Sequence, residues 1–179
     1  MSIENTPMDS YIRTFTGRKF WPLNPNPDDV AIEDIAHALA YKCRYNGHTD
    51  RFYSVAEHSY RVSLFCTKPN RLVGLLHDAA EAYLPDVPRP IKPHLPGFKE
   101  LERKIDRAIA VHFGTPYPFP EEVHVIDYSI LTDEMREMLN YGDGPYGPPL
   151  YAHTDEFGWR PKLAERQFLR KFSKLIEEN

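Results

Sequence analysis

One short stretch of the chain carries three side chains that can bind a metal or move a proton. His77 and Asp78 are adjacent, and Glu81 follows four residues after the histidine. The stretch over residues 70–83 has helical spacing, and residues three or four apart share a helix face. The spacing therefore predicts that the three polar heads lie together. An adjacent His and Asp also occur by chance in many chains, so the interpretation depends on further candidates.

Two more side chains of the metal-ligand type occur on predicted inward faces. His58 lies on the apolar stripe of a helix that begins with the capping-box pattern of Ser54 and Glu57. Asp127 lies on the inward stripe of a helix expected over about 121–139. Each alone is more often a hydrogen-bonded core residue, but a buried carboxylate without a partner costs several kcal/mol. Two imidazoles and two carboxylates together predict a site for one divalent transition metal (Co, Mn, Zn, Ni or Fe), with His58, His77, Asp78 and Asp127 as its ligands.

Such a metal polarises a phosphoryl group and lowers the pKa of bound water. Glu81 lies near the ligands without belonging to them, so we expect it to orient or deprotonate the attacking water, or to protonate the leaving group. Asp86 fits the same role, and the residues alone do not separate the two.

An anionic substrate in this acidic surrounding needs positive charge. Arg44 and Lys92, with Arg89 as a third candidate, are predicted to contact phosphate. Tyr45 is a candidate to stack a base. The plainer interpretations are that the arginines and the lysine are solvated loop charges and that the tyrosine packs in the core. The run of Glu, Lys and Arg at residues 100–107 is predicted to be a solvated helix face.

The elements that must position these residues are helices. Apolar positions recur at helical spacing over about 29–41, 55–65, 70–83, 98–113, 121–139 and 161–177. A short strand is expected within residues 11–16, turning at Gly17, and the Gly- and Pro-rich residues 141–159 predict a long surface loop. The pattern predicts an all-α fold: one domain over residues 1–179, with about six helices, a helical core over about 30–140, and a short irregular or β-like N-terminal segment.

Composition limits the classes of protein that fit. Of 179 residues, 41% are apolar and the net charge is −4, which does not favour binding to a nucleic-acid polymer. No stretch approaches the roughly 20 apolar residues of a membrane span, and the N-terminus lacks a signal-peptide pattern. Cys43 and Cys66 form neither a disulfide framework nor a zinc pattern. We expect reduced thiols, a cytoplasmic location and no membrane partner.

The order of these residues resembles the signature of the HD-domain metal-dependent phosphohydrolases. The segments that carry the resemblance are 55–59, 77–81, 86–92 and 125–127, within a similarity that covers roughly residues 30–140. They are similar to the bacterial deoxyribonucleoside 5′-monophosphatases and to phage dATP triphosphohydrolases.

The resemblance implies the same metal ligands, Glu81 as the catalytic carboxylate, and Asp86 as a second catalytic or sugar-reading residue. It matches Arg44 and Lys92 to phosphate contacts and Tyr45 to a neighbouring aromatic. Pro90 and His124 complete the implied substrate contacts, with His124 where many relatives carry lysine. The implied partners are a small deoxynucleotide and further copies of the chain, as a dimer or hexamer.

The predicted activity is hydrolysis of deoxyribonucleotides, with the 5′-monophosphate slightly favoured because obvious basic side chains are few. Release of triphosphate from a dNTP is the alternative. Hydrolysis of a cyclic dinucleotide or alarmone, or nucleotide binding without catalysis, also stays open. The spare carboxyl of Glu81 argues against the last of these, because a structural metal site does not need it.

Overall fold

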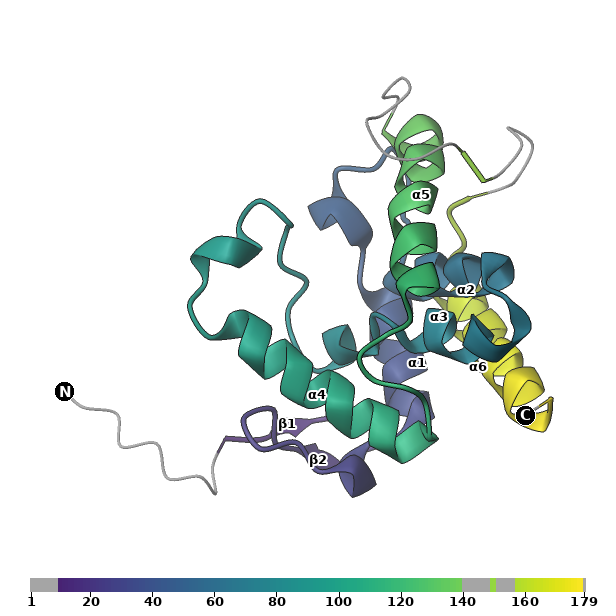
Figure 1. Ribbon diagram of the computed structural model, residues 1–179. Helices are drawn as coiled ribbons and strands as arrows, with labels where there is room; N and C mark the ends of the chain where they lie inside the picture. Colours follow the sequence, from purple (N-terminus) through teal and green to yellow (C-terminus); the bar gives the residue numbers. More distant parts are fainter. Residues whose placement is uncertain (1–9, 140–148, 151–156, 179) are drawn as a thin grey trace.

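The chain is all-α, with a short N-terminal hairpin (Figure 1). The computed structural model describes residues 10–139, 149–150 and 157–178, so most of the loop predicted over 141–159 lies outside the described residues. Within them lie six α-helices, as the sequence predicts: α1 (Ile32–Tyr41), α2 (Val55–Phe65), α3 (Arg71–Leu76), α4 (Phe98–Phe113), α5 (Glu121–Met138) and α6 (Pro161–Glu177). Short 3-10 turns connect them: η1 (Pro27–Asp29), η2 (Arg44–Gly47), η3 (Lys68–Asn70), η4 (Ala79–Ala82) and η5 (Lys92–His94).

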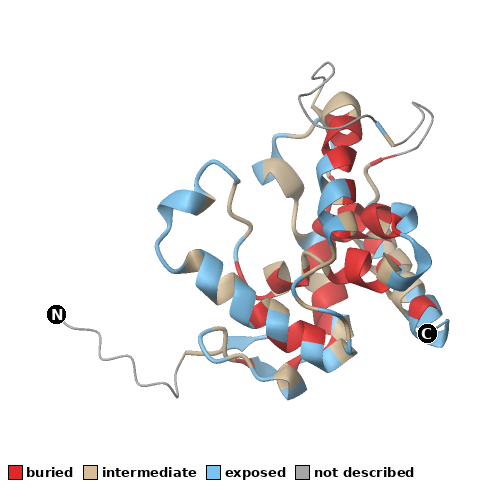
Figure 2. Ribbon diagram, viewed as in Figure 1, coloured by how far each residue is buried: buried red, intermediate tan, exposed pale blue. Residues whose placement is uncertain are grey.

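The core forms where α1, α2, α3 and α6 pack against one another. Its fully buried side chains include Ile35 of α1, Val55 of α2, Leu75 of α3 and Phe168 of α6. Burying a large aliphatic or aromatic side chain stabilises the fold by about 1.5–3 kcal/mol. Figure 2 shows the buried residues concentrated at this junction and in the C-terminal half of α5, while the segment leading into α4 is largely exposed. The core therefore supports α2, which carries His58, and α3, which leads directly into His77.

The N-terminal hairpin is fastened to α1. Strands β1 (Ile12–Arg13) and β2 (Lys19–Phe20) pair antiparallel around a turn that includes Gly17, whose φ is 85°. The Thr16 backbone N–H and hydroxyl donate to the buried Asp34 carboxylate at 2.7 and 3.0 Å. The predicted turn is confirmed, but the strand before it has only two residues.

The prediction of one continuous helix over residues 70–83 is wrong, because only Arg71–Leu76 form α3. α3 ends at Leu76, His77 and Asp78 form a turn, and η4 follows. The backbone leaves helical geometry at Asp78, where φ is −99° and ψ is 12°. The Gly74 carbonyl, which a continuing helix would pair with the N–H of residue 78, accepts a hydrogen bond from the His77 ring at 2.8 Å. The side chain of His77 thus competes with the backbone at the point where the helix stops.

The helix pair α2 and α3 is packed so closely that it requires a glycine. A Cβ atom at Gly74 would lie 2.7 Å from Cys66 Sγ and 3.3 Å from Ser63 Cα.

Both Cys66 and Cys43 are free thiols, and burial, with the Glu122 carboxylate, raises the pKa of Cys66 to about 12. Among the described helices, none is both long and apolar enough to cross a lipid bilayer.

Candidate metal centre

Three of the four predicted ligands meet at one point, from elements far apart in sequence. His58 comes from α2, His77 from the turn after α3, and Asp127 from α5, and their ligand atoms lie within 4.8 Å of one another. His58 Nε2 is 3.3 Å from His77 Nε2 and 3.1 Å from Asp127 Oδ1. His77 Nε2 is 3.8 Å from the same Asp127 oxygen.

The fourth predicted ligand, Asp78, faces the same two imidazoles. Its Oδ2 atom lies 3.3 Å from His77 Nε2 and 3.6 Å from His58 Nε2. That oxygen is also 3.5 Å from Arg44 Nη1. The turn at His77 and Asp78 thus brings both adjacent side chains to the cluster, although the sequence predicted a continuous helix there.

Hydrogen bonds at Nδ1 determine which nitrogen of each imidazole is left free to bind a metal. His58 Nδ1 donates to Glu134 at 2.5 Å, and His77 Nδ1 donates to the Gly74 carbonyl at 2.8 Å. Burial raises the pKa of Glu134, but Arg44 and His58 together lower it to about 2, so the carboxylate is ionised and can only accept. In each neutral ring the lone pair is therefore on Nε2, and the two Nε2 atoms face each other across the cluster.

The cluster favours a positive charge at its centre. Burial lowers the pKa of His77, yet the Asp78 and Asp127 carboxylates raise it to about 9. Two imidazole nitrogens and carboxylate oxygens of this kind also suit a borderline divalent metal. A cation between them would separate the two facing lone pairs and balance the carboxylates. The residues present therefore fit a divalent transition metal.

Glu134 is a site residue that the sequence argument missed. It is completely buried and accepts four hydrogen bonds: from His58, from Tyr53 at 2.8 Å, from Tyr45 at 2.6 Å and from Arg44 at 3.1 Å. A carboxylate behind a metal-ligand histidine fixes the ring and increases its basicity. The signal was present, because residue 134 lies two turns after Asp127 on the same face of α5.

Arg44 and Tyr45, predicted to bind phosphate and base, are both engaged by Glu134. Tyr45 packs at the small cluster formed by Tyr53, Met138 and Phe157. Its φ is 54° and that of Asn46 is 51°, a left-handed conformation that is rare and costly for a tyrosine. The strained turn η2 thus places these two side chains behind the histidines. Their predicted contacts with substrate stay predictions.

Glu81 lies beside the cluster with one carboxyl oxygen unsatisfied. Its Oε2 atom is buried and has no hydrogen-bond partner among the described residues. Burial, with Asp78 and Asp86 nearby, raises the pKa of Glu81 to about 8, although Arg44 and Lys42 lower it. The Lys42 ammonium donates to the carbonyls of Glu81 and Leu84. Glu81 is therefore a carboxyl that can gain or lose a proton near neutral pH, on a backbone segment that Lys42 holds.

The other predicted contacts lie in the segment after η4, except for His124 on α5. Asp86 is half-buried and Pro90 is exposed. Lys92 lies in η5, where its ammonium pairs with Glu102 of α4 at 2.6 Å. His124 is exposed on α5 with its ring near Phe119. Within the described chain, neither Pro90 nor His124 has a hydrogen bond or ion pair with the cluster, and their predicted roles stay untested.

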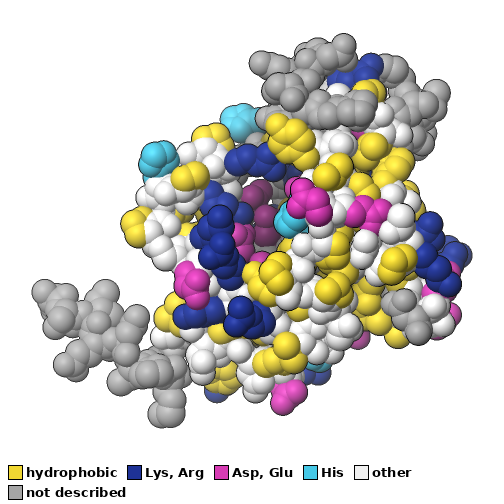
Figure 3. All heavy atoms as spheres, in the orientation of Figure 1, with side chains coloured by type: hydrophobic (Ala, Val, Ile, Leu, Met, Phe, Trp, Pro, Cys, Tyr) yellow, Lys and Arg dark blue, Asp and Glu magenta, His cyan; other side chains and the backbone are white. Residues whose placement is uncertain are grey.

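The expectation of a solvated helix face at residues 100–107 is wrong at two positions. Glu102 is half-buried against Lys92. Asp106 is also half-buried, and burial together with Glu102 and Asp78 raises its pKa to about 8, although His77 and Lys92 lower it. Because Asp78 and His77 act on it, Asp106 lies on the side of α4 that faces the cluster. Figure 3 shows a hollow on this face with acidic side chains inside it and Lys and Arg side chains along its rim.

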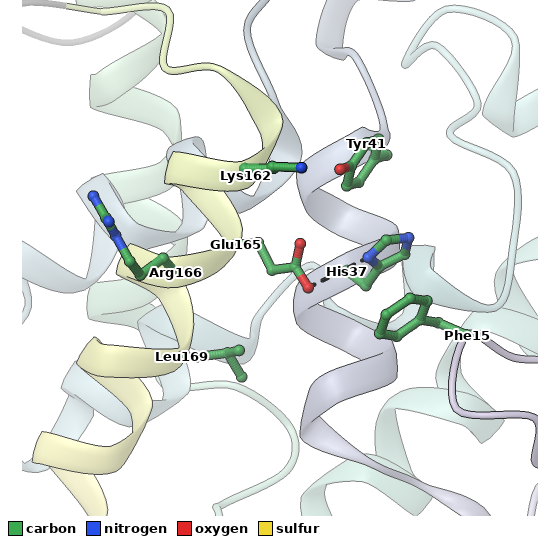
Figure 4. A pocket seen from close by; sticks show the side chains of 7 residues that line it. All are labelled: Phe15, His37, Tyr41, Lys162, Glu165, Arg166 and Leu169. Carbon is green, nitrogen blue, oxygen red and sulfur yellow. Dashed lines mark hydrogen bonds and ion pairs between the residues drawn. The ribbon is translucent and has the colours of Figure 1, made fainter.

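A second hollow lies away from these residues, between α1 and α6. It has a volume of about 540 Å³ and is lined by Phe15, His37, Tyr41, Lys162, Glu165, Arg166 and Leu169 (Figure 4). His37 stacks between the rings of Phe15 and Tyr41 at 3.7 and 4.5 Å, and its Nδ1 atom pairs with Glu165 at 3.3 Å. None of the predicted site residues is among the residues that line this hollow.

Comparison with known proteins gives two relatives. No family model matches the chain. An uncharacterized protein of Rhodobacter capsulatus is 40% identical over 121 residues, which is 62% of either chain. The uncharacterized protein YfdR of Escherichia coli is 37% identical over 173 residues, covering 94% of this chain and 97% of the relative. At that identity and coverage, the chain belongs to the family of YfdR.

Proposed function

We propose that the chain is a divalent-metal-dependent phosphohydrolase of the HD type that acts on deoxyribonucleotides, with 5′-monophosphates as its favoured substrates. The observation that carries the proposal is the meeting of His58, His77 and Asp127 from three separate elements. Both rings direct Nε2 to the same point, and Asp78 adds a carboxylate facing them. The similarity to HD enzymes supplies the substrate class.

The chain's own residues divide the remaining work. A metal held by His58, His77, Asp78 and Asp127 would supply positive charge that polarises a phosphoryl group. Glu134 keeps His58 in the required tautomer through its 2.5 Å hydrogen bond. Glu134 is in turn held by Arg44 and two tyrosines. These three donors and His58 account for the four hydrogen bonds that it accepts.

Hydrolysis of a phosphate ester forms a bond between a water oxygen and phosphorus and breaks the bond from phosphorus to the sugar oxygen. The water must lose a proton, and the departing oxygen must gain one. Glu81 is suited to one of these transfers because its Oε2 atom has no protein partner and its pKa is about 8. Asp86 remains the second candidate for the same transfer.

Product analysis separates the possible activities. The full chain is incubated with Co²⁺ or Mn²⁺ and either a dNMP or a dNTP, and the products are identified. Free phosphate from the monophosphate is expected; tripolyphosphate from the dNTP would establish the alternative activity. Parallel assays with a cyclic dinucleotide and an alarmone cover the other hydrolytic reactions.

Variants test the assignment of residues. His77→Ala is expected to lose bound metal and turnover, while Glu81→Gln keeps the metal and loses turnover. His94→Ala is the matched control, since His94 is exposed on η5. The proposal fails if no substrate turns over with any metal and His77→Ala binds as much metal as the unmodified chain. Nucleotide binding that needs neither metal nor Glu81, without turnover, would instead indicate a binding module.

A further inference from the structure

Three basic side chains near the candidate ligands, Arg44, Lys42 and Lys92, are already paired with protein oxygens. Arg44 is paired with Glu134 and Asp78, and Lys42 donates to two backbone carbonyls. Lys92 is paired with Glu102. An incoming phosphate must therefore displace one of these partners or find its positive charge elsewhere.

Among these basic side chains, Lys92 is the one that a phosphate can reach most easily. Its side chain is 34% exposed, against 14% for Arg44, and among the described residues it pairs with a single carboxylate, that of Glu102, whose side chain is 23% exposed. Burial lowers the pKa of Lys92, while Glu102 and then the Glu81 and Asp78 carboxylates raise it, so the charges of the cluster act on this ammonium. Arg89 is exposed over the Tyr128 ring. An ion pair between this exposed guanidinium and a substrate phosphate would contribute only about 0–1 kcal/mol to binding.

The face of α4 that carries Glu102, which we call the α4 wall, also carries the carboxyl of Asp106. Glu102 and Asp106 lie one turn apart on α4, and α4 packs against both η4 and η5. The raised pKa of Asp106 is consistent with surroundings that disfavour a further negative charge. A monophosphate carries about two negative charges at neutral pH, and a triphosphate carries more. A longer phosphate chain extending towards α4 would therefore approach the carboxylates of Glu102 and Asp106. The nearest ammonium, that of Lys92, is already paired with Glu102.

We propose that Glu102 determines phosphate-chain length in this site: by holding Lys92 and adding negative charge to the α4 wall, it selects a nucleoside monophosphate over a triphosphate. The inference rests on the proposed phosphohydrolase function. It assigns a role to a residue that the sequence pattern places on a solvated helix face.

The test compares kcat/KM for a dNTP with kcat/KM for the matching dNMP in the full-length, metal-loaded protein. Glu102→Gln removes the charge and releases Lys92, and a hydrogen bond to a charged group is worth enough to change the ratio of dNTP to dNMP about tenfold. The same change in a Lys92→Met background should alter the ratio by no more than about twofold, because the ammonium that it releases is gone and only the solvent-screened charge on α4 still changes. Glu100→Gln, an equal charge change on the exposed side of α4, should leave both activities unchanged.

Each outcome decides the matter. A selective gain for the dNTP in Glu102→Gln that disappears without Lys92 supports the proposal. An unchanged ratio, a change equal to that of Glu100→Gln, or an unmodified protein that already prefers the dNTP overturns it while leaving the phosphohydrolase function standing. Absence of turnover on either substrate by the unmodified protein overturns both.

Discussion

Replacing Glu134 with glutamine should strongly destabilise this protein, because no orientation of the amide can satisfy the four donors around it. One carboxylate oxygen accepts from His58 and Tyr53, and the other accepts from Arg44 and Tyr45. In Glu134→Gln, the amide nitrogen must face one of these pairs as a donor. Either His58 or Arg44 then loses its acceptor, in a region where Glu134 is completely buried.

Two routes give a similar magnitude. Loss of a hydrogen bond to a charged group costs about 1.5–3 kcal/mol, and the donor left behind is desolvated. Independently, the pKa of Glu134 is about 2, against an ordinary 4.5. A difference of about 2.5, at about 1.4 kcal/mol for each pKa unit, corresponds to about 3 kcal/mol. We therefore expect Glu134→Gln to lower the free energy of unfolding by about 3 kcal/mol at pH 7.

Urea unfolding of the metal-free chain measures this loss, with Glu121→Gln as the control because Glu121 is exposed on the same helix. The control should differ from the unmodified chain by less than about 0.5 kcal/mol. In a separate titration, metal affinity should fall about 10- to 100-fold in Glu134→Gln, since His58 loses its supporting carboxylate. An unchanged urea midpoint in Glu134→Gln would refute the account of this hydrogen-bond network.

The pH dependence follows from the sign of the shift. The folded-state pKa of Glu134 is lowered, so its contribution to stability is present above about pH 4.5 and is lost as the pH falls towards about 2. The difference between the unmodified chain and Glu134→Gln should therefore be large at pH 7 and shrink over that window. A difference that stays constant from pH 7 to pH 3 would mean that the carboxylate charge is not the cause.

Three further changes have defined outcomes. Asp106 has a raised pKa of about 8, so its contribution to stability is present below about pH 4 and lost as the pH rises through 8; Asp106→Asn should match the unmodified chain at pH 4 and exceed its thermal stability at pH 9. Glu81→Gln should lower kcat about 10²- to 10⁴-fold in the nucleotidase assay, with metal content unchanged. Gly74→Val should cost about 1–3 kcal/mol in urea unfolding, because its Cβ meets Cys66 and the Ser63 backbone.

The sequence was informative about the candidate ligands because metal chemistry restricts the residue types that can serve. An inward His58 or Asp127 contradicts the apolar pattern around it, and that contradiction is visible without a structure. Glu134 contradicts the pattern equally, but it forms its bonds to partners 76–90 residues away in the chain. Nothing in local spacing indicates that His58, Arg44 and two tyrosines meet there. Supporting carboxylates of this kind depend on tertiary packing alone.

The capping box shows the same limit within one helix. Ser54 does cap α2, since its hydroxyl accepts from the Glu57 N–H at 3.1 Å. The reciprocal bond expected from Glu57 is replaced by other contacts: its carboxylate accepts from Arg61, one turn further along α2, and from the distant backbone N–H groups of Gly158 and Trp159. The local signal correctly predicted where the helix starts, but the charge on Glu57 serves to anchor the segment that leads into α6.

The break after α3 explains why an adjacent His and Asp can act on one centre. In a continuous helix, neighbouring side chains point about 100° apart around the axis, so His77 and Asp78 would face different sides. The turn at Asp78 changes this, and the Asp78 carboxylate comes within 3.3 Å of His77 Nε2. The hydrogen bond from the His77 ring to the Gly74 carbonyl orients the ring and uses a carbonyl acceptor in the last turn of α3. A substitution at position 77 should therefore disturb the placement of Asp78 as well, so two of the four candidate ligands depend on one side chain.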